Sequence, residues 1–242
     1  IPMIGSWAGT IGDFAFNPAD GTGVLVNYSK GWSWPCRLYA AKYVHNDSVS
    51  NWHLWGGGNW GGPTYDILNP SASMKGYAYP QIVHLGNGNY LVVSGYAETT
   101  SASGMLTAGR YLEGTPPVWQ WWSGTAWEQG GSYLHATLDG NTTFNTAQTM
   151  RLVRLADHQA SLTYLIDTQL FEILYDETVS PTWSAPQLIA TCSTSYPLLS
   201  WQLTVDDAGT AWLLYLDPGT GVLYLRKRPA GDAWSAPEPI FT

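Results

Sequence analysis

The sequence predicts an all-β fold, a β-propeller built from four antiparallel blades of four strands each. Short apolar runs separated by turn signals predict strands, and no segment sustains the apolar period of 3.6 residues that a helix needs. A unit of about 40 residues also recurs along the chain, and this is the length of a propeller blade. The chain combines only 12% charged residues with 14 Trp, 15 Tyr and 26 Gly, which is typical of a compact β protein with many turns.

The stretch 201–241 shows the repeating unit in its clearest form. Turn signals at 206–209, 217–221 and 229–232 divide it into four short runs rich in Leu, Val, Tyr and Trp. Glycine supplies the positive φ that tight hairpins need, while Asp and Pro favour the entry to a turn. Four strands joined by three short hairpins form an antiparallel meander with the size of one blade.

The same unit occurs 51 residues upstream. Tyr164 corresponds to Tyr215, and the tetrapeptide Trp-Ser-Ala-Pro occurs at 183–186 and again at 234–237. These pairs share one spacing and their alignment needs no gap, so chance is a poor explanation. The match predicts a second blade of the same kind.

Two further copies precede these repeats. Tyr43 corresponds to Tyr111, which lies 68 residues later, and Trp52 corresponds to Trp119, which lies 67 residues later. Each copy begins with a predicted hairpin around a turn rich in Gly and Asn. The four repeats lie near 12–62, 80–133, 150–190 and 201–241.

We expect one propeller domain over residues 1–242, with residues 1–11 adding a strand that closes the ring. Four blades either close a ring by themselves or form part of a larger propeller. An unclosed set would leave exposed sheet edges, which favour aggregation unless something covers them. Association with other chains would cover them, so self-association is an expected property.

Charge and hydropathy restrict the class of partner. The formal net charge is −8, and binding to nucleic acid or to an anionic membrane needs clustered Lys and Arg, so neither is expected as a partner. The basic run 226–228 is interpreted as a solvated face of an outer strand. No run of 18 apolar residues occurs, so membrane insertion is not expected. Cys36 and Cys192 form either a long-range disulfide or two buried thiols.

The repeated motif Trp-Ser-Ala-Pro-x-x-Ile, at 183–189 and 234–240, resembles the end of each blade in sialidase-like β-propellers of the Asp-box type and in related propeller lectins. The Asp-box itself is matched only by 207–212, which lacks the initial Ser and lies in the first hairpin of its repeat. The resemblance implies a site with three arginines, a Tyr–Glu nucleophile pair and an acidic Asp. The nearest arginines are Arg151 and Arg154, and no first-strand arginine has the required context. The resemblance therefore extends to the propeller architecture.

A glycosidase on this fold would need two carboxylates facing each other, roughly 5–10 Å apart. Acidic residues on or beside predicted inner strands are Asp13, Asp157, Asp206 and Asp207. Asp206 and Asp207 lie in a turn, where Asp caps backbone amides. Asp13 begins the first inner strand and is the best candidate for a catalytic base if the protein is an enzyme. The five histidines show no paired spacing and no calcium loop occurs, so the sequence predicts neither a metal nor a cofactor.

Aromatic residues are the strongest functional signal, because a sugar ring stacks its apolar face on Trp or Tyr. Aromatics that recur between repeats, such as Trp183 and Trp234, are interpreted as packing between blades. Trp121 is expected to face outward, because side chains along a strand alternate. The candidate ligand-binding residues are the aromatics that do not recur, namely Trp32, Trp34, Tyr77, Tyr79 and Trp121.

These patterns predict a non-catalytic, lectin-like module that binds carbohydrate or polysaccharide, located outside the cell or on a cell or virion surface. The repeats, the many aromatics and the lack of a complete catalytic set favour this function. One alternative is a structural or adhesive component, such as a filament subunit or a phage tail-fibre domain. The other is a glycoside hydrolase or lyase that uses the axial funnel.

Overall fold

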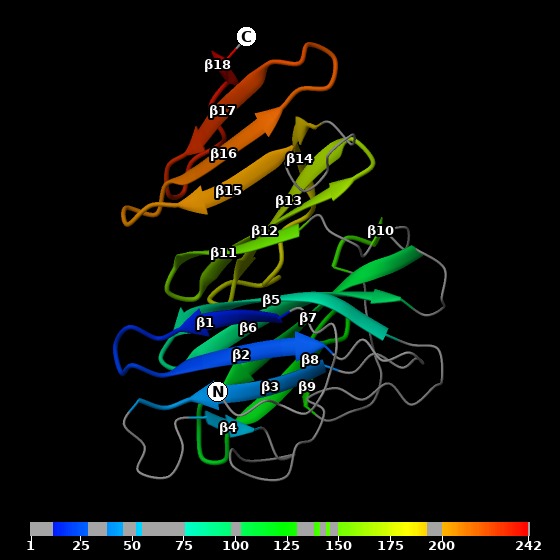
Figure 1. The fold of residues 1–242 in the computed structure, drawn as a ribbon. Coiled ribbons are helices and arrows are strands. Elements are labelled where there is room, and N and C mark those ends of the chain that lie inside the picture. The colour runs from blue at the N-terminus through cyan, green and yellow to red at the C-terminus, as the bar shows by residue number, and fades with distance from the viewer. Residues whose placement is uncertain are drawn as a thin grey trace. The chain divides into compact units, whose positions relative to one another are not determined.

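The computed structural model describes residues 12–28, 38–45, 52–54, 76–97, 103–129, 138–140, 144–145, 150–192 and 200–241. The chain divides into two compact units, Ile1–Ala147 and Gln148–Thr242, and each is described by itself. Figure 1 shows the strands of both units. No segment within the described ranges forms a helix long and apolar enough to cross a membrane.

The first unit contains two antiparallel sheets. The first sheet has the order β1 (Gly12–Phe16), β2 (Gly23–Tyr28), β3 (Leu38–Tyr43) and β4 (Trp52–Leu54). The second has the order β5 (Gly76–Gly86), β6 (Asn89–Ala97), β7 (Ser103–Leu112), β8 (Val118–Trp122) and β9 (Trp127–Gln129), while β10 (Phe144–Asn145) pairs with β7.

The second sheet therefore has six strands, where the sequence predicts four. The additional hairpin β8–β9 arises because Gly124 adopts a φ of 101°, which turns the chain directly after Trp122. Trp122 then pairs with Trp127, and the two rings pack edge to face at 5.4 Å. The all-β class and the antiparallel meander are confirmed.

Packing between the two sheets forms the core of the first unit. Val24, Val26 and Leu38 of the first sheet are fully buried and pack with Tyr111 and Trp119 of the second. The inner strands β1 and β5 lie side by side (Figure 1). This is the arrangement expected for neighbouring blades.

The second unit contains two four-stranded antiparallel sheets, each in simple meander order. The third sheet consists of β11 (Met150–Ala156), β12 (Gln159–Ile166), β13 (Gln169–Asp176) and β14 (Gln187–Thr191). The fourth consists of β15 (Trp201–Val205), β16 (Ala211–Leu216), β17 (Leu223–Arg228) and β18 (Glu238–Phe241).

The predicted turns of the fourth sheet are confirmed. Gly209, Gly221 and Gly231 lie in them with φ values of 79°, 68° and 79°. These conformations are accessible to glycine without the steric cost that a Cβ would bring. The four antiparallel sheets follow the predicted repeats in sequence, whereas ring closure and a single domain over 1–242 stay predictions.

The third and fourth sheets enclose a second core. Of the two recurrent tryptophans, Trp234 belongs to this core and Trp183 packs against the third sheet. Trp234 is 9% exposed and packs with Leu165, Leu213 and other buried residues of both sheets. Trp183 is 6% exposed and contacts the ring of Tyr175 at 4.7 Å. The interpretation as packing between blades is confirmed for Trp234, whereas Trp183 is buried against its own sheet and its packing between blades stays a prediction.

A buried ion pair crosses this second interface. Glu172 of β13 and Arg228 of β17 are 2% and 6% exposed, and the Arg228 guanidinium donates to Oε1 of Glu172 at 3.0 Å. Glu172 also accepts from Ser161 Oγ at 2.5 Å and from Trp234 Nε1 at 2.8 Å. The interpretation of 226–228 as a solvated face is therefore wrong for Arg228, because Glu172 on the neighbouring sheet supplies a counter-charge.

Cys192 is a buried free thiol. It lies in the second core beside Trp201, and burial raises the pKa of its thiol to about 12. Cys36 lies outside the described residues.

Candidate functional site

The five candidate ligand-binding aromatics do not form one described site. Trp32 and Trp34 lie outside the described residues, and so does the side chain of Tyr77, whose backbone belongs to β5. Tyr79 is half-buried and has a φ of 52°, next to a register shift between β5 and β6. Their binding role stays a prediction.

Trp121 does not face outward, so that expectation is wrong. It is 7% exposed, stacks on Trp119 with ring centroids 6.5 Å apart, and belongs to the core between the first two sheets. Trp121 lies on the same face of β8 as Trp119, because the two are separated by one residue. Gly109 opposite provides the space, since a Cβ there would lie 2.6 Å from the Trp121 ring.

Asp13, the candidate for a catalytic base, accepts hydrogen bonds from two strands of the first unit, and its catalytic role stays a prediction. Asp13 Oδ2 accepts a hydrogen bond of 2.9 Å from the backbone N–H of Ile82, and Oδ1 accepts one of 2.9 Å from the N–H of Phe14. The first contact joins strand β1 to strand β5 of the neighbouring sheet. Asp13 therefore fixes one inner strand against the next.

Asp206 is likewise engaged by its own hairpin. Its carboxylate accepts hydrogen bonds from the N–H groups of Ala208 and Thr210 at 3.0 and 2.9 Å, and from Trp212 Nε1 at 2.9 Å. The Trp212 contact and the backbone amides lower the pKa of Asp206. These contacts confirm that 207–212 is an ordinary hairpin turn.

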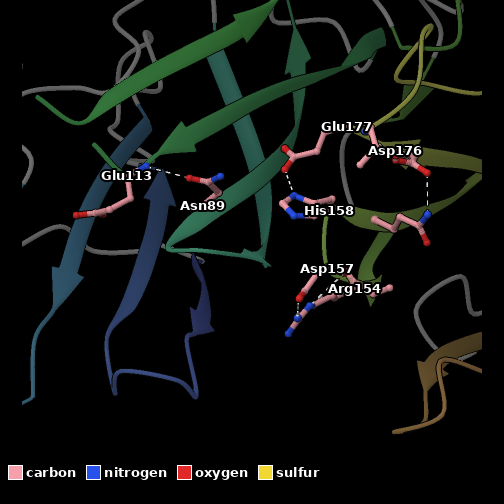
Figure 2. A network of polar contacts seen from close by, with 10 residues as sticks. Asn89, Glu113, Arg154, Asp157, His158, Asp176 and Glu177 are labelled. Carbon is pink, nitrogen blue, oxygen red and sulfur yellow. Dashed lines mark hydrogen bonds and ion pairs between the residues drawn. The ribbon is translucent and has the colours of Figure 1, made fainter. Parts of the chain in front are cut away.

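Polar side chains gather instead at one end of the third sheet (Figure 2). They come from the β11–β12 hairpin and from the end of β13, which lie together because Gln159 pairs with Asp176 across the β12–β13 ladder. We call this group the hairpin-end cluster, and its members are Arg154, Asp157, His158, Gln159, Asp176 and Glu177.

His158 is the centre of the hairpin-end cluster. It has a φ of 67°, in the left-handed region that L-residues other than Asn, Asp and His seldom adopt. Its Nδ1 contacts the Glu177 carboxylate, and its carbonyl oxygen accepts a hydrogen bond of 3.1 Å from the Glu177 N–H. The side chain of His158 is 32% exposed, while that of Glu177 is 13% exposed. Glu177 therefore holds one ring nitrogen and leaves the ring open to solvent on another side.

The remaining members of the cluster add charge and hydrogen-bonding groups. Arg154 donates to Asp157, and both side chains are exposed. Gln159 Nε2 donates to Asp176 Oδ2 at 2.7 Å. Hydrogen bonds from Thr178, followed by those from Gln159, lower the pKa of Asp176, so its carboxylate is ionised at neutral pH.

None of the six residues recurs in the fourth sheet. At the position 51 residues after His158, the fourth sheet has Gly209, with a φ of 79°. The positions that correspond to Asp176 and Glu177 carry Lys227 and Arg228. The positive φ of this position is shared, whereas the polar side chains belong to the third sheet alone. Comparing the two repeats for differences as well as for matches would have revealed the cluster from sequence.

A second polar network ties the two sheets of the first unit together. Lys42 Nζ lies 3.0 and 2.9 Å from the two carboxylate oxygens of Glu113, and Tyr111 donates to the same carboxylate at 2.7 Å. Asn89 Oδ1 accepts from the Glu113 N–H at 3.0 Å (Figure 2). Burial raises the pKa of the neighbouring Tyr90 to about 12. These contacts link β3 to β7 and serve packing.

The structure offers no metal site in the part of the chain that it describes. No group of three or more His, Cys, Asp or Glu side chains in the described ranges lies close enough together to hold a metal ion.

No protein-family model and no curated protein matches the chain. Among solved structures, an exo-β-1,3-galactanase from Phanerochaete chrysosporium is 11% identical with a TM-score of 0.45, over 95% of this chain and 49% of that one. An exo-β-1,3-galactanase from Clostridium thermocellum is 9% identical with a TM-score of 0.49, over 94% and 47%. The lectin of Aleuria aurantia, a six-bladed β-propeller, is 10% identical with a TM-score of 0.33, over 96% of both chains.

The chain thus spans about half the length of the two galactanases. All three TM-scores are below 0.5, so these similarities assign neither a family nor a function to the chain. None of the three proteins is a sialidase, and the resemblance to sialidase-like propellers stays a prediction.

Proposed function

We propose that this protein is a non-catalytic, extracellular carbohydrate-binding module, and that the hairpin-end cluster forms the polar part of its sugar site. The observation that carries the proposal is the backbone of His158. A left-handed conformation costs an L-residue about 1–2 kcal/mol, and glycine avoids this cost at the corresponding position of the fourth sheet. A histidine at this position, with its ring held by Glu177, favours a role for its side chain.

The chemistry of the cluster suits sugar hydroxyls, which both donate and accept hydrogen bonds. Exposed Arg154 supplies donors, and the Asp157 carboxylate supplies acceptors. Since Glu177 engages Nδ1 of His158, the ring is fixed in orientation and Nε2 is the nitrogen left for a ligand. Within the described ranges, no hydrogen bond to Nε2 of His158 is formed.

The contacts of the candidate acids favour a non-catalytic role. Asp13 and Asp206 each accept several hydrogen bonds from the surrounding chain, and these bonds hold them as structural groups. A retaining or inverting glycosidase needs a pair of carboxylates that can act on the sugar. These two acids do not supply such a pair.

A glycan array followed by calorimetric titration of the best ligand tests the proposal. His158→Gly removes the ring while giving the turn the residue that suits its backbone, so the fold should keep its stability to within about 1 kcal/mol. We expect the variant to bind at least about 10-fold more weakly, because it loses a hydrogen-bonding partner of the sugar.

Asp167→Gly is the matched control. Asp167 also has a positive φ, 53°, but it lies in the β12–β13 hairpin at the opposite end of the same sheet. This variant should bind like the original protein. Equal binding by the His158→Gly variant and the original would overturn the placement of the site, and no binding of any glycan at millimolar concentration would overturn the function.

A glycoside hydrolase or lyase is the second candidate, and the His158–Glu177 contact is the observation that favours it. A histidine held by a carboxylate is a common general base. Release of reducing ends or unsaturated products from a polysaccharide, abolished in His158→Gly, would favour this candidate over a binding module.

A further inference from the structure

Two buried polar atoms beside Glu172 form no hydrogen bond to any of the residues that the structure describes. They are Oγ1 of Thr163 on β12 and Nε of Arg228 on β17, and these residues are 0% and 6% exposed. We propose that one water molecule is bound at this point between the third and fourth sheets, where it bridges Thr163, Arg228 and Glu172. Such a site lies in the interior of the second unit and does not depend on the proposed sugar-binding function.

The strand register and the buried ion pair bring the three residues together. Thr163 stands opposite Glu172 in the β12–β13 ladder, and opposite residues of an antiparallel pair project from the same face with Cβ atoms about 4.5–5.5 Å apart. Arg228 Nη2 donates to Glu172 Oε1 at 3.0 Å, and Nε belongs to the same planar guanidinium. Both atoms therefore lie beside one carboxylate.

The surroundings of the Arg228 guanidinium leave Nε in need of an acceptor. The guanidinium lies over the Trp234 ring, 5.3 Å from its centroid. This ring covers a face of the guanidinium, whereas every guanidinium N–H bond lies in the plane and points past the edge. A buried donor of a charged group that lacks an acceptor is costly, so an acceptor at the edge stabilises the fold.

The Glu172 carboxylate can accept one more hydrogen bond. Among the described residues, Oε1 accepts from Ser161 and Arg228, and Oε2 accepts from Trp234 Nε1. A carboxylate offers about four acceptor positions, which leaves one on Oε2. A water molecule that donates to Oε2 and accepts from Thr163 Oγ1 and Arg228 Nε makes about three hydrogen bonds, as buried water typically does.

A bridging water satisfies both atoms at once, which the described side chains do not. Thr163 Oγ1 and Arg228 Nε do not hydrogen-bond each other. The positions 51 residues after Thr163 and Glu172 carry Leu214 and Leu223, so the fourth sheet has no polar counterpart of this pair. The site is therefore specific to the face of the third sheet that packs on the fourth.

A row of polar side chains leads from the end of the third sheet to this point. Gln159, Ser161 and Thr163 alternate along β12 and lie on one face of it. Gln159 is half-buried and belongs to the hairpin-end cluster, and Ser161 donates to Glu172 at 2.5 Å. Water that enters from the hairpin end can exchange hydrogen bonds along this row.

Thermal unfolding of Thr163→Val tests the inference by the sign of the change. Valine keeps the shape of threonine and removes only the hydroxyl. If that hydroxyl binds water, the variant loses a hydrogen bond and its unfolding midpoint should fall by about 4–8 °C for a unit of this size. A hydroxyl buried without a partner would give the opposite result, because its removal relieves a desolvation cost.

Ser161→Ala is the matched control, because the Ser161 hydroxyl donates directly to Glu172. This variant should also lower the midpoint, and it should keep the water. A Thr163→Val variant that is as stable as the original protein, or more stable, overturns the inference.

A crystal structure of the original protein at high resolution provides the direct measurement. We expect water density at about 2.7–3.2 Å from Thr163 Oγ1, Arg228 Nε and Glu172 Oε2, and no such density in Thr163→Val. A direct hydrogen bond between Thr163 and Arg228, or a side chain of the protein in place of the water, overturns the inference even if Thr163→Val is destabilised.

Discussion

Replacing Glu172 by Gln should destabilise the second unit by about 3–5 kcal/mol, because it removes the charge that balances buried Arg228. The change keeps the shape of the side chain, so no cavity contributes to the effect. The amide oxygen can still accept from Arg228 and Ser161, but the amide NH₂ then faces the Trp234 indole N–H, and two donors oppose each other at the former 2.8 Å contact. The unsatisfied donor alone costs about 1–3 kcal/mol.

Urea unfolding monitored by tryptophan fluorescence measures this loss. Glu238→Gln removes a carboxylate of the same unit that is exposed on β18, and it should change the unfolding free energy by less than about 0.5 kcal/mol. A loss below about 1 kcal/mol for Glu172→Gln would refute the reasoning, because it would mean that Arg228 reaches water or another acceptor.

The paired replacement Glu172→Leu with Arg228→Met separates charge balance from packing. Removing both charges leaves no buried ion without a partner, so the double variant should be more stable than Glu172→Leu alone. A double variant that loses the sum of the two single effects would show that the two side chains act independently.

Three further predictions follow from other contacts. Gly109→Ala should destabilise the first unit by about 1–3 kcal/mol in thermal unfolding, because its Cβ would overlap the buried Trp121 ring. Cys192 should resist alkylation in the folded protein at about pH 8 and react after unfolding, because burial raises the pKa of its thiol to about 12. Asp206→Asn should weaken the loss of stability in acid. Hydrogen bonds lower the pKa of the Asp206 carboxyl in the folded state from its ordinary value of 3.8. Its contribution to folding stability is therefore present above pH 3.8 and disappears as the pH falls through the lowered folded pKa.

Each of these has a control within the chain. Gly114→Ala has room for a Cβ, with its nearest neighbour at 3.4 Å, and should be nearly neutral. A Cys36→Ser background restricts the alkylation signal to Cys192. Asp207→Asn changes the adjacent carboxylate in the same turn, and unequal acid profiles for the two variants would distinguish the contacts of Asp206 from a general charge effect.

Local signals explain most of what the sequence could predict. Glycines at 209, 221 and 231 fix the turns of the fourth sheet by their own conformational freedom, and the strands follow from the apolar runs between them. The repeated Trp-Ser-Ala-Pro motif likewise identifies packing positions, and Trp183 and Trp234 are buried. Information of this kind lies within a few residues of the feature it predicts.

Contacts between sheets could not be predicted in the same way. The burial of Arg228 depends on Glu172, which lies 56 residues earlier, and the role of Asp13 depends on the Ile82 amide, which lies 69 residues later. Strand alternation alone does not predict the burial of Trp121, because this burial depends on the space that Gly109 leaves on the neighbouring strand. The six residues of the hairpin-end cluster do not recur in the fourth sheet, so the similarity between repeats carries no signal for them.

A protein built from similar blades must also prevent the wrong blades from pairing during folding. Apolar faces of related sequence distinguish poorly between partners, since any of them can bury the same area. Glu172 makes this choice specific, because burial against a sheet without a cation at the right position would leave it uncompensated, at a cost of about 3–5 kcal/mol. Its own repeat-mate in the fourth sheet is Leu223, and that of Arg228 in the third sheet is Glu177, so exchange of the two sheets would not recreate the pair. The buried charges thereby define the order in which the third and fourth sheets pack, although the sequences of these two repeats are otherwise nearly interchangeable.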